Sequence, residues 1–222
     1  MKYKNSYKLS SLALTGALAI GSVAVPTVAS AELSSDLSIS SMYLWRGQDV
    51  SAGNPAVSSS ITYDFGNGFS VGTWASSEGA SGSYEVDLLA TYAGTVGEFG
   101  YSLGVADYLY PQDPASLTDS DISEYILSGS YMDFSLTAYI NTNQSDNDDY
   151  KYYSLDYSLG KVGLHYGMTS VGTSANEYSD INVSYALTDN LSWTISKAMG
   201  NLIDANPTME DPLIMIGYSV PL

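Results

Sequence analysis

The sequence predicts an all-β fold, an antiparallel transmembrane β-barrel of about 12 strands with short periplasmic turns and longer extracellular loops. After residue 32, segments of alternating apolar and polar residues recur along the chain, without helical periodicity. The connections between these segments are short and long in turn, which is typical of outer-membrane barrels. One face of each segment is almost free of charge, and the other is mostly Ser, Thr and Gly.

An export signal precedes the predicted barrel. Three lysines within the first eight residues form a positive region, an apolar stretch follows, and "ASA" at 29–31 fits the small-residue cleavage rule. We therefore expect residues 1–31 to be a cleaved signal peptide and residues 32–222 to form the barrel. No later run of 18 apolar residues exists, so the sequence predicts no transmembrane helix after cleavage.

The first six strands are bounded by turn residues and by loops of alternating length. They are expected at residues 36–46, 55–65, 68–77, 83–95, 98–109 and 122–132. The long loop "GQDVSAGN" separates the first two strands, whereas only "GNG" separates the second from the third. In the second strand Val57, Ile61 and Tyr63 share one side, as a strand with one apolar face requires.

The last six strands continue this pattern to the C-terminus. They are expected at residues 133–142, 150–159, 162–172, 178–187, 191–199 and 213–222. The ending "PLIMIGYSVPL" resembles the terminal strand by which the barrel-insertion machinery recognises bacterial outer-membrane proteins, although that pattern usually ends in Phe rather than Leu222. We therefore expect a location in the bacterial outer membrane, among its lipid and lipopolysaccharide.

Composition excludes several classes of function. Three of the seven basic residues lie in the signal, which leaves four against 24 acidic residues. So acidic a chain is unsuited to nucleic acid and to phosphate-rich ligands, because both need a basic surface. The chain has no cysteine and therefore no disulfides. A closed barrel offers another source of stability because it leaves no unpaired strand edge.

Four motifs stand at the start of the predicted barrel. They are "WRG" at 45–47, "NPAV" at 54–57, "TWAS" at 73–76 and "YEVDLLATYAG" at 84–94. Together they resemble the opening strands of the TorF-type family of outer-membrane porins, over roughly the first third of the mature chain. The resemblance implies an outer-membrane barrel with porin activity, and it brings no site residues with it.

The polar sides of the predicted strands carry the candidate pore-lining residues. These are Arg46, Asp64, Trp74, Glu85, Asp87, Glu124, Asp156, His165 and Asp180. Six acids against one arginine, in a lumen narrowed by the low strand number, favour cations and small neutral solutes over anions. The sequence thus predicts a channel for passive diffusion of small, neutral or cationic solutes.

Arg46 is expected at the outer end of the first strand. If the strand alternates through residue 46, Tyr43 and Trp45 face lipid and Arg46 faces the lumen, since an arginine in lipid is costly. In one interpretation, Arg46 faces Glu85 and Asp87 across the lumen and helps to set ion selectivity. In the other, it ties down the first long loop by bonding to backbone carbonyls.

The single histidine, His165, does not indicate an enzyme. It is expected near the short turn at 160–161, whereas a lipid-hydrolysing barrel needs its serine and histidine at the lipid-facing outer rim. The acidic loops lack the spacing of a calcium loop with glycine at its sixth position. The sequence therefore predicts no catalytic residues, no cofactor and no metal site, with weak Ca²⁺ or Mg²⁺ bridging to lipopolysaccharide as the alternative for the loops.

A non-conducting barrel is the alternative to the channel. In that case tyrosines would fill the lumen, and the loops would bind a partner or support the envelope. The tyrosines in question are Tyr108, Tyr110, Tyr139 and Tyr152. A soluble periplasmic β-protein is a third class, although 14% charged residues and 20 tyrosines would give it a sticky surface.

Overall fold

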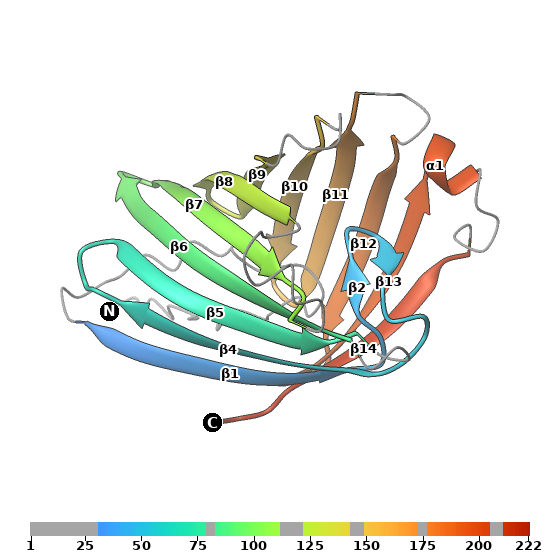
Figure 1. Ribbon diagram of the computed structural model, residues 1–222, viewed down its shortest axis with the longest axis horizontal. Coiled ribbons are helices and arrows are strands. Elements are labelled where there is room, and N and C mark those ends of the chain that lie inside the picture. The colour runs from blue at the N-terminus through green and yellow to red at the C-terminus, as the bar shows by residue number, and fades with distance from the viewer. Residues whose placement is uncertain (1–30, 79–82, 112–121, 143–148, 173–176, 205–210) are drawn as a thin grey trace, which may run out of the picture.

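A computed structural model describes residues 31–78, 83–111, 122–142, 149–172, 177–204 and 211–222. Across them, twelve antiparallel strands close into a barrel in the order β1-β14-β13-β12-β11-β10-β9-β8-β7-β6-β5-β4 (Figure 1). The predicted fold class is confirmed, and each expected strand overlaps one strand of the barrel wall. The predicted signal peptide lies outside the described residues, apart from Ala31.

The wall strands are numbered in chain order together with two short strands. They are β1 (Glu32–Ser40), β4 (Ala56–Asp64), β5 (Phe69–Ser77), β6 (Tyr84–Val96), β7 (Phe99–Leu109), β8 (Ile122–Tyr131), β9 (Phe134–Asn141), β10 (Lys151–Leu159), β11 (Val162–Ser170), β12 (Ser179–Ala186), β13 (Leu191–Met199) and β14 (Leu213–Ser219). The short strands are β2 (Leu44–Trp45) and β3 (Gln48–Asp49), and α1 (Asn201–Asp204) is a single helical turn. Within the described part of the chain, no helix has the length and apolar character needed to cross a membrane.

Two-residue turns hold the register at one end of the barrel. β6 continues into β7 through Gly97 (φ 64°), β10 into β11 through Gly160 (φ 59°), and β8 into β9 through Met132 (φ 53°). A positive φ at this position is typical of tight hairpins, whose twist then matches that of the strands. A two-residue turn fixes the pairing register of the two strands that it joins. A shift of this register by one residue would move every side chain of a strand to the opposite face.

The two faces of the wall differ as a transmembrane barrel requires. On β7, Leu103 and Val105 point outward and are 53% and 44% exposed, whereas Ser102 and Ala106 point inward and are buried. The other wall strands show the same contrast between an apolar exterior and a polar interior of small side chains. This arrangement suits a barrel surrounded by hydrocarbon, with a polar lumen.

The last strand is shorter than predicted. β14 ends at Ser219, after which the N–H of Val220 donates to the carbonyl oxygen of Leu37 at 2.8 Å. Pro221 follows and has no N–H to continue the ladder. The alternation itself is as predicted, because Ile214, Ile216 and Tyr218 are exposed on the outer face.

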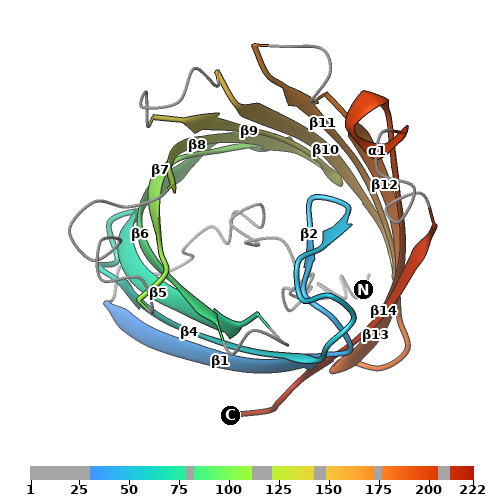
Figure 2. The ribbon, with the colours of Figure 1, turned by 45° about the vertical axis from the view of Figure 1, so that its right-hand side comes forward.

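The first predicted strand is wrong beyond residue 40. β1 ends at Ser40, and the chain then leaves the wall and forms a small hairpin in which β2 pairs with β3. Arg46 and Gly47 form its turn, with φ values of 48° and 78°, the combination that reverses a chain within two residues. Figure 2 shows this hairpin inside the ring of wall strands. Tyr43, which was expected to face lipid, is therefore buried.

Arginine substitutions on the outer face of β7 test the orientation of the wall. Leu103→Arg places a charge near the middle of the strand, and we expect it to lower the free energy of unfolding in lipid vesicles by about 2–4 kcal/mol. Asp107→Arg, on the same face near the strand end, is the control and should cost only about 0–1 kcal/mol. Denaturant titration followed by tryptophan fluorescence measures both, and equal losses would contradict the assigned face.

Candidate functional site

The inner hairpin, which comprises residues 43–50, is closed by its own hydrogen bonds. The N–H of Val50 donates to the carbonyl oxygen of Tyr43 at 2.9 Å, and the N–H of Tyr43 donates to Ser51 Oγ at 2.8 Å. Asp49 holds the segment that follows, because its Oδ2 accepts the N–H of Gly53 at 2.6 Å. The hairpin therefore enters the lumen as a defined structure rather than as a slack loop.

Three side chains anchor the inner hairpin to different parts of the wall. The pairs are Tyr43 with Glu85 on β6 (3.1 Å), Arg46 with Glu124 on β8 (2.7 Å), and Gln48 with Tyr178 just before β12 (2.7 Å). β8 lies five strands from β1 in one direction around the barrel and seven in the other. The hairpin thus spans the barrel to its opposite wall and narrows the lumen at the end that carries the long loops.

The Arg46–Glu124 pair is the central anchor. Arg46 Nη2 donates to both carboxylate oxygens of Glu124, at 2.9 and 2.7 Å, and the Tyr108 hydroxyl donates to Oε2 at 2.8 Å. The two charged side chains are 4% and 1% exposed. At this depth a lone charge is strongly destabilising, whereas a paired and hydrogen-bonded one is tolerated.

Aromatic rings enclose the guanidinium of Arg46. The ring centroids around its Cζ are those of Trp45 (4.5 Å), Tyr139 (4.7 Å), Tyr152 (4.8 Å) and Tyr150 (5.4 Å). Burial alone lowers the pKa of Arg46, but the Glu124 carboxylate more than offsets this, so the pKa stays above its usual value. Trp45, which was expected on the lipid side, therefore lies inside the barrel.

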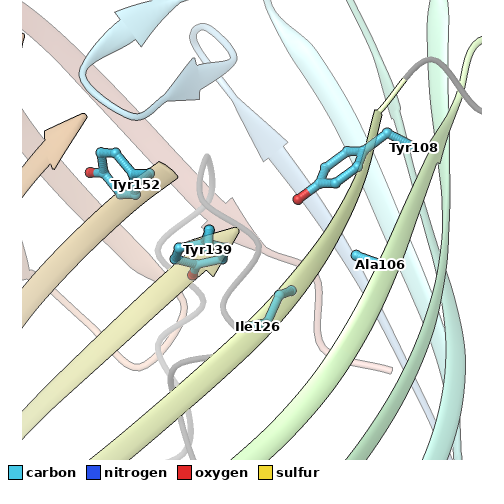
Figure 3. Close-up of a cluster of buried hydrophobic side chains, with 5 residues drawn as sticks. All are labelled: Ala106, Tyr108, Ile126, Tyr139 and Tyr152. Carbon is cyan, nitrogen blue, oxygen red and sulfur yellow. The ribbon is translucent and has the colours of Figure 1, made fainter. Parts of the chain in front are cut away.

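Tyrosines from several strands pack beside the inner hairpin. Tyr108, Tyr139 and Tyr152 are buried in one cluster with Ala106 and Ile126, and Figure 3 shows the three rings on the inner side of the wall. The rings of Tyr139 and Tyr152 lie 5.9 Å apart. The fourth tyrosine of the sequence analysis, Tyr110, packs partly buried against this cluster.

Gly47 brings the tip of the inner hairpin against β12. A Cβ at this position would overlap the Cβ of Asp180, so a larger residue would displace the tip. Asp180 is buried and accepts hydrogen bonds from the Tyr152 hydroxyl at 2.8 Å and from Asn182 Nδ2 at 3.2 Å. Close packing therefore positions the tip in addition to the three polar anchors.

His165 connects Asp180 to Asp156 on the inner wall. Its Nδ1 lies 2.6 Å from Asp156 Oδ1, and its Nε2 lies 2.8 Å from the Tyr152 hydroxyl and 3.3 Å from Asp180 Oδ2. These contacts extend from the hairpin tip along β12, β11 and β10. None of these partners is a serine, so the network differs from the serine–histidine pair of a lipid hydrolase.

Glu85 and Asp87 share the inward face of β6 beside the inner hairpin. Asp87 is fully buried. Among the described residues no N–H or hydroxyl group donates to its carboxylate oxygens, but its carboxyl shares a side-chain hydrogen bond with that of Glu85. Its register partner on β5 is Trp74, whose ring lies 5.6 Å from that of Tyr43. Trp74 therefore lies on the inner face, where the alternation had placed it.

Asp64 stands apart from the other pore-lining candidates. It is the last residue of β4, and its Oδ1 accepts the N–H of Gly66 at 2.6 Å in the turn to β5. The other eight candidates lie on the inner face of the wall or in the hairpin within it. Within the described part of the chain, Arg46 bonds to the carboxylate of Glu124, and not to backbone carbonyls or to the Glu85 and Asp87 partners that the sequence suggested.

The sequence analysis missed Tyr43, Gln48 and Tyr178 as parts of this site. All three contribute to the site because the hairpin leaves the wall and enters the lumen. They were missed because the apolar run "MYLW" was assigned to a continuous wall strand. The available signal was "RGQD", because Arg-Gly followed by polar residues is compatible with a turn. Among the described residues, no group of three or more His, Cys, Asp or Glu side chains is placed to hold a metal ion.

Comparison with known proteins agrees with the observed fold. A family model described as "Bacterial protein of unknown function (Gcw_chp)" matches residues 25–208. A solved KdgM porin is similar at 14% identity and a TM-score of 0.51, over 85% of this chain and 99% of that one. The KdgM porin in complex with disordered oligogalacturonate is similar at 12% identity and a TM-score of 0.50, over 86% and 99%.

Weaker similarity extends to an enzyme of the outer membrane. An active-site mutant of the outer-membrane phospholipase A of Escherichia coli is similar at 11% identity and a TM-score of 0.46, over 88% of this chain and 93% of that one. No curated protein matches the chain significantly in sequence. The fold similarity rests on the two KdgM porin structures, whose barrel architecture this chain shares.

Substitution of Gly47 tests whether the inner hairpin is docked in the lumen. In Gly47→Ala the new Cβ overlaps Asp180 and the φ of 78° is strained, so we expect the hairpin to leave its site. Gly53→Ala is the matched control, because its φ is 77° but nothing lies within 4 Å of the new Cβ. Chymotrypsin should cut within residues 43–45 at least about tenfold faster in Gly47→Ala than in the control. Equal resistance of the two variants would contradict docking.

Proposed function

We propose that this chain, which belongs to the bacterial Gcw_chp family of unknown function, is an outer-membrane channel for passive diffusion of small, neutral or cationic solutes. The observation that carries the proposal is the set of carboxylates on the inner wall around the inner hairpin. The closed twelve-strand wall supplies the passage, and the hairpin supplies its narrow part.

Charge in the narrowed part of the lumen favours cations. Arg46 and Glu124 neutralise each other, and Asp180 lies 3.3 Å from His165 Nε2, whereas Glu85 and Asp87 have no arginine or lysine bonded to them among the described residues. Carboxylates that are left uncompensated in a narrow, low-dielectric passage attract cations and repel anions. We therefore expect small cations and neutral solutes to pass in preference to anions.

The same charge argues against acidic oligosaccharides as solutes. One of the similar porin structures holds oligogalacturonate, an acidic saccharide, and a channel for such a ligand would be expected to present basic side chains. In the present lumen, the guanidinium of Arg46 is already bound to Glu124. The similarity to that porin therefore supports the barrel architecture, and the lining supports a different class of solute.

Small side chains leave more space away from the inner hairpin. The inward positions there include Gly72, Ser102, Gly104, Ser128, Thr137, Gly163 and Ser184. Such residues project little into the lumen and offer hydroxyl groups to a hydrated solute. The hairpin therefore sets the width of the passage, and the opposite half acts as a vestibule.

Location and partners follow from the same proposal. The barrel would lie in the outer membrane among lipid and lipopolysaccharide, and the outward residues of β14 would present the apolar pattern that the insertion machinery recognises. The resemblance of the motifs within residues 45–94 to TorF-type porins supports this reading. We propose no catalytic role, because the hydrogen-bond partners of His165 are a tyrosine and carboxylates.

A non-conducting barrel is the second candidate, and the packing at the long-loop end favours it. Tyr108, Tyr139 and Tyr152 are buried together, and the inner hairpin occupies the space beside them. Such a barrel would act through its loops or by supporting the envelope. Liposome swelling with neutral sugars of graded size separates the candidates, because swelling supports the channel and its absence supports the filled barrel.

Arg46→Ala in planar bilayers tests the role of the central anchor. The change removes both the tie to β8 and the charge that neutralises Glu124, so conductance and cation preference should rise at low salt. The increase in preference should fade at high salt as the carboxylates are screened. Lys161→Ala, in the exposed turn between β10 and β11, is the control and should behave as wild type. An unchanged reversal potential in a folded Arg46→Ala barrel would leave Arg46 with an anchoring role alone.

A further inference from the structure

The single histidine of the chain lies between two acids on the inner wall. His165 is on β11, and its register partners are Asp156 on β10 and Asn182 on β12. Its Nδ1 lies 2.6 Å from Asp156 Oδ1. Its Nε2 lies 2.8 Å from the Tyr152 hydroxyl and 3.3 Å from Asp180 Oδ2. Both nitrogens of the ring therefore face oxygen atoms.

The directions of these hydrogen bonds require both ring nitrogens to be donors. The Asp156 carboxylate offers only acceptors to Nδ1. The Tyr152 hydroxyl donates its one proton to Asp180 Oδ1 at 2.8 Å, so it presents an oxygen lone pair to Nε2. A neutral imidazole has an N–H at one nitrogen and would leave the other facing an acceptor. An imidazolium satisfies all of these contacts.

A glycine on β11 allows Tyr152 to reach Asp180 across an intervening strand. Tyr152 is on β10 and Asp180 is on β12, and Gly167 is the register partner of Asp180 on the strand between them. A Cβ at Gly167 would overlap both the Tyr152 hydroxyl and Asp180 Oδ1. The missing side chain therefore makes room for the network of His165, Tyr152 and Asp180.

Asp180 packs directly against the tip of the inner hairpin. The space between its Cβ and Gly47 is too small for a further carbon atom, and Asp180 is 0% exposed. A buried carboxylate is tolerated only when a partner offsets its charge. Within the described part of the chain, His165 is the basic side chain that forms an ion pair with Asp180. The charge of His165 and the seating of the hairpin tip thus meet at one carboxylate.

We propose that His165 acts as an imidazolium that holds the inner hairpin docked through Asp180, so that loss of its proton releases the hairpin and widens the passage. His165 is then a positioning residue, because it acts on the passage through Asp180 and the hairpin. This inference rests on the proposed channel for the effect on solute flow, but the docking itself does not depend on conduction.

The sign of the pH dependence follows from the buried carboxylate. Below the pH at which His165 loses its proton, Asp180 has a cation beside it and the hairpin is docked. Above this pH, Asp180 is a buried charge without a cation, and movement of the tip away from it would admit water. The docked form therefore binds more protons than the released form, and linkage makes high pH favour release.

The ionisable groups that face the His165 network come from three parts of the structure. They are Asp156 and Tyr152 on β10, Asp180 on β12 and Tyr178 just before it, and Arg46 on the inner hairpin. Arg46 already bonds to Glu124, so its guanidinium does not replace the imidazolium at Asp180. Two carboxylates beside one ring therefore stabilise its charged form.

NMR of the imidazole nitrogens tests the charge of His165, and the chain has no second histidine to confuse the signals. In untagged, isotope-labelled barrel in micelles at pH 7, both ring nitrogens should carry protons. Asp156→Asn should lower the pH of half-deprotonation by about 1 or more, because a neighbouring carboxylate stabilises the imidazolium. Glu98→Gln, in the exposed turn between β6 and β7, is the matched control and should leave this pH unchanged.

Two NMR results would overturn the proposal. They are a neutral ring in wild type at pH 7 and an equal pH of half-deprotonation in Asp156→Asn and wild type. Neither measurement needs a substitution at His165 itself, and the Asp156 side chain is 36% exposed, so folding of the barrel does not depend on burying it.

Chymotrypsin digestion at constant pH tests the link from His165 to the hairpin. At pH 7, His165→Gln should be cut within residues 43–45 at least about tenfold faster than wild type, because glutamine keeps an N–H donor but has no charge. Combining it with Asp180→Asn should restore slow cutting, because a neutral side chain at 180 needs no cation. A double variant that is cut as fast as His165→Gln would show that shape rather than charge matters, and would overturn the proposal.

Bilayer recordings separate failure of this proposal from failure of the channel. Wild-type conductance should rise over the pH range in which NMR shows His165 losing its proton, and that of His165→Gln should stay constant there. A constant wild-type conductance over this range overturns the widening of the passage and leaves the channel. A silent bilayer, together with the expected NMR and digestion results, overturns the channel and supports His165 as the residue that holds the hairpin in a non-conducting barrel.

Discussion

Backbone pairing in a medium without water is the constraint on which the rest of this structure depends. The sheet closes on itself through β1 and β14, so that every wall strand pairs on both sides, which is what a barrel in lipid would require because lipid offers no partners to N–H and C=O groups. Closure gives each strand one side toward the exterior and one toward the lumen, as Leu103 and Ser102 illustrate. Closure also leaves no unpaired strand edge. The pairing of the first and last wall strands therefore joins the two ends of the sheet in a chain that has no cysteine for disulfides.

A closed wall of this size creates an interior that must be filled or hydrated, and the inner hairpin occupies part of it. Electrostatics rather than apolar burial specifies its position. The turn presents Arg46 to Glu124, and the surrounding rings accept the guanidinium face while Tyr108 satisfies the carboxylate. Because a buried charge needs its partner, one cation on the hairpin and one acid on the far wall determine where the loop lies.

The buried acids of the lumen fall into two groups according to their partners. Glu124 and Asp180 are engaged by the hairpin and by tyrosines, so they contribute to the shape of the passage. Asp87 is bonded instead to the neighbouring carboxyl of Glu85 on the same strand. Tyr43 connects the groups, because it bonds to Glu85 and also covers Trp74 beside Asp87. The position of the inner hairpin therefore depends on the same few contacts that hold these acids.

The sequence by itself determined the wall. Alternation such as that of Ser102 and Leu103, and tight turns such as Gly97, are local consequences of a strand between lipid and lumen, so they are visible within a few residues. The sign of the lumen charge was equally visible, because it depends on composition.

Only the tertiary structure decided what occupies the lumen. Arg46 and Glu124 are 78 residues apart, and Gly47 meets Asp180 on β12, far along the chain, so no local pattern encodes either contact. The apolar run "MYLW" is compatible with a wall strand, whose aromatic side chains face outward, and equally with an inner hairpin, whose aromatic side chains pack inside the barrel. Its residue pattern alone therefore does not distinguish the two.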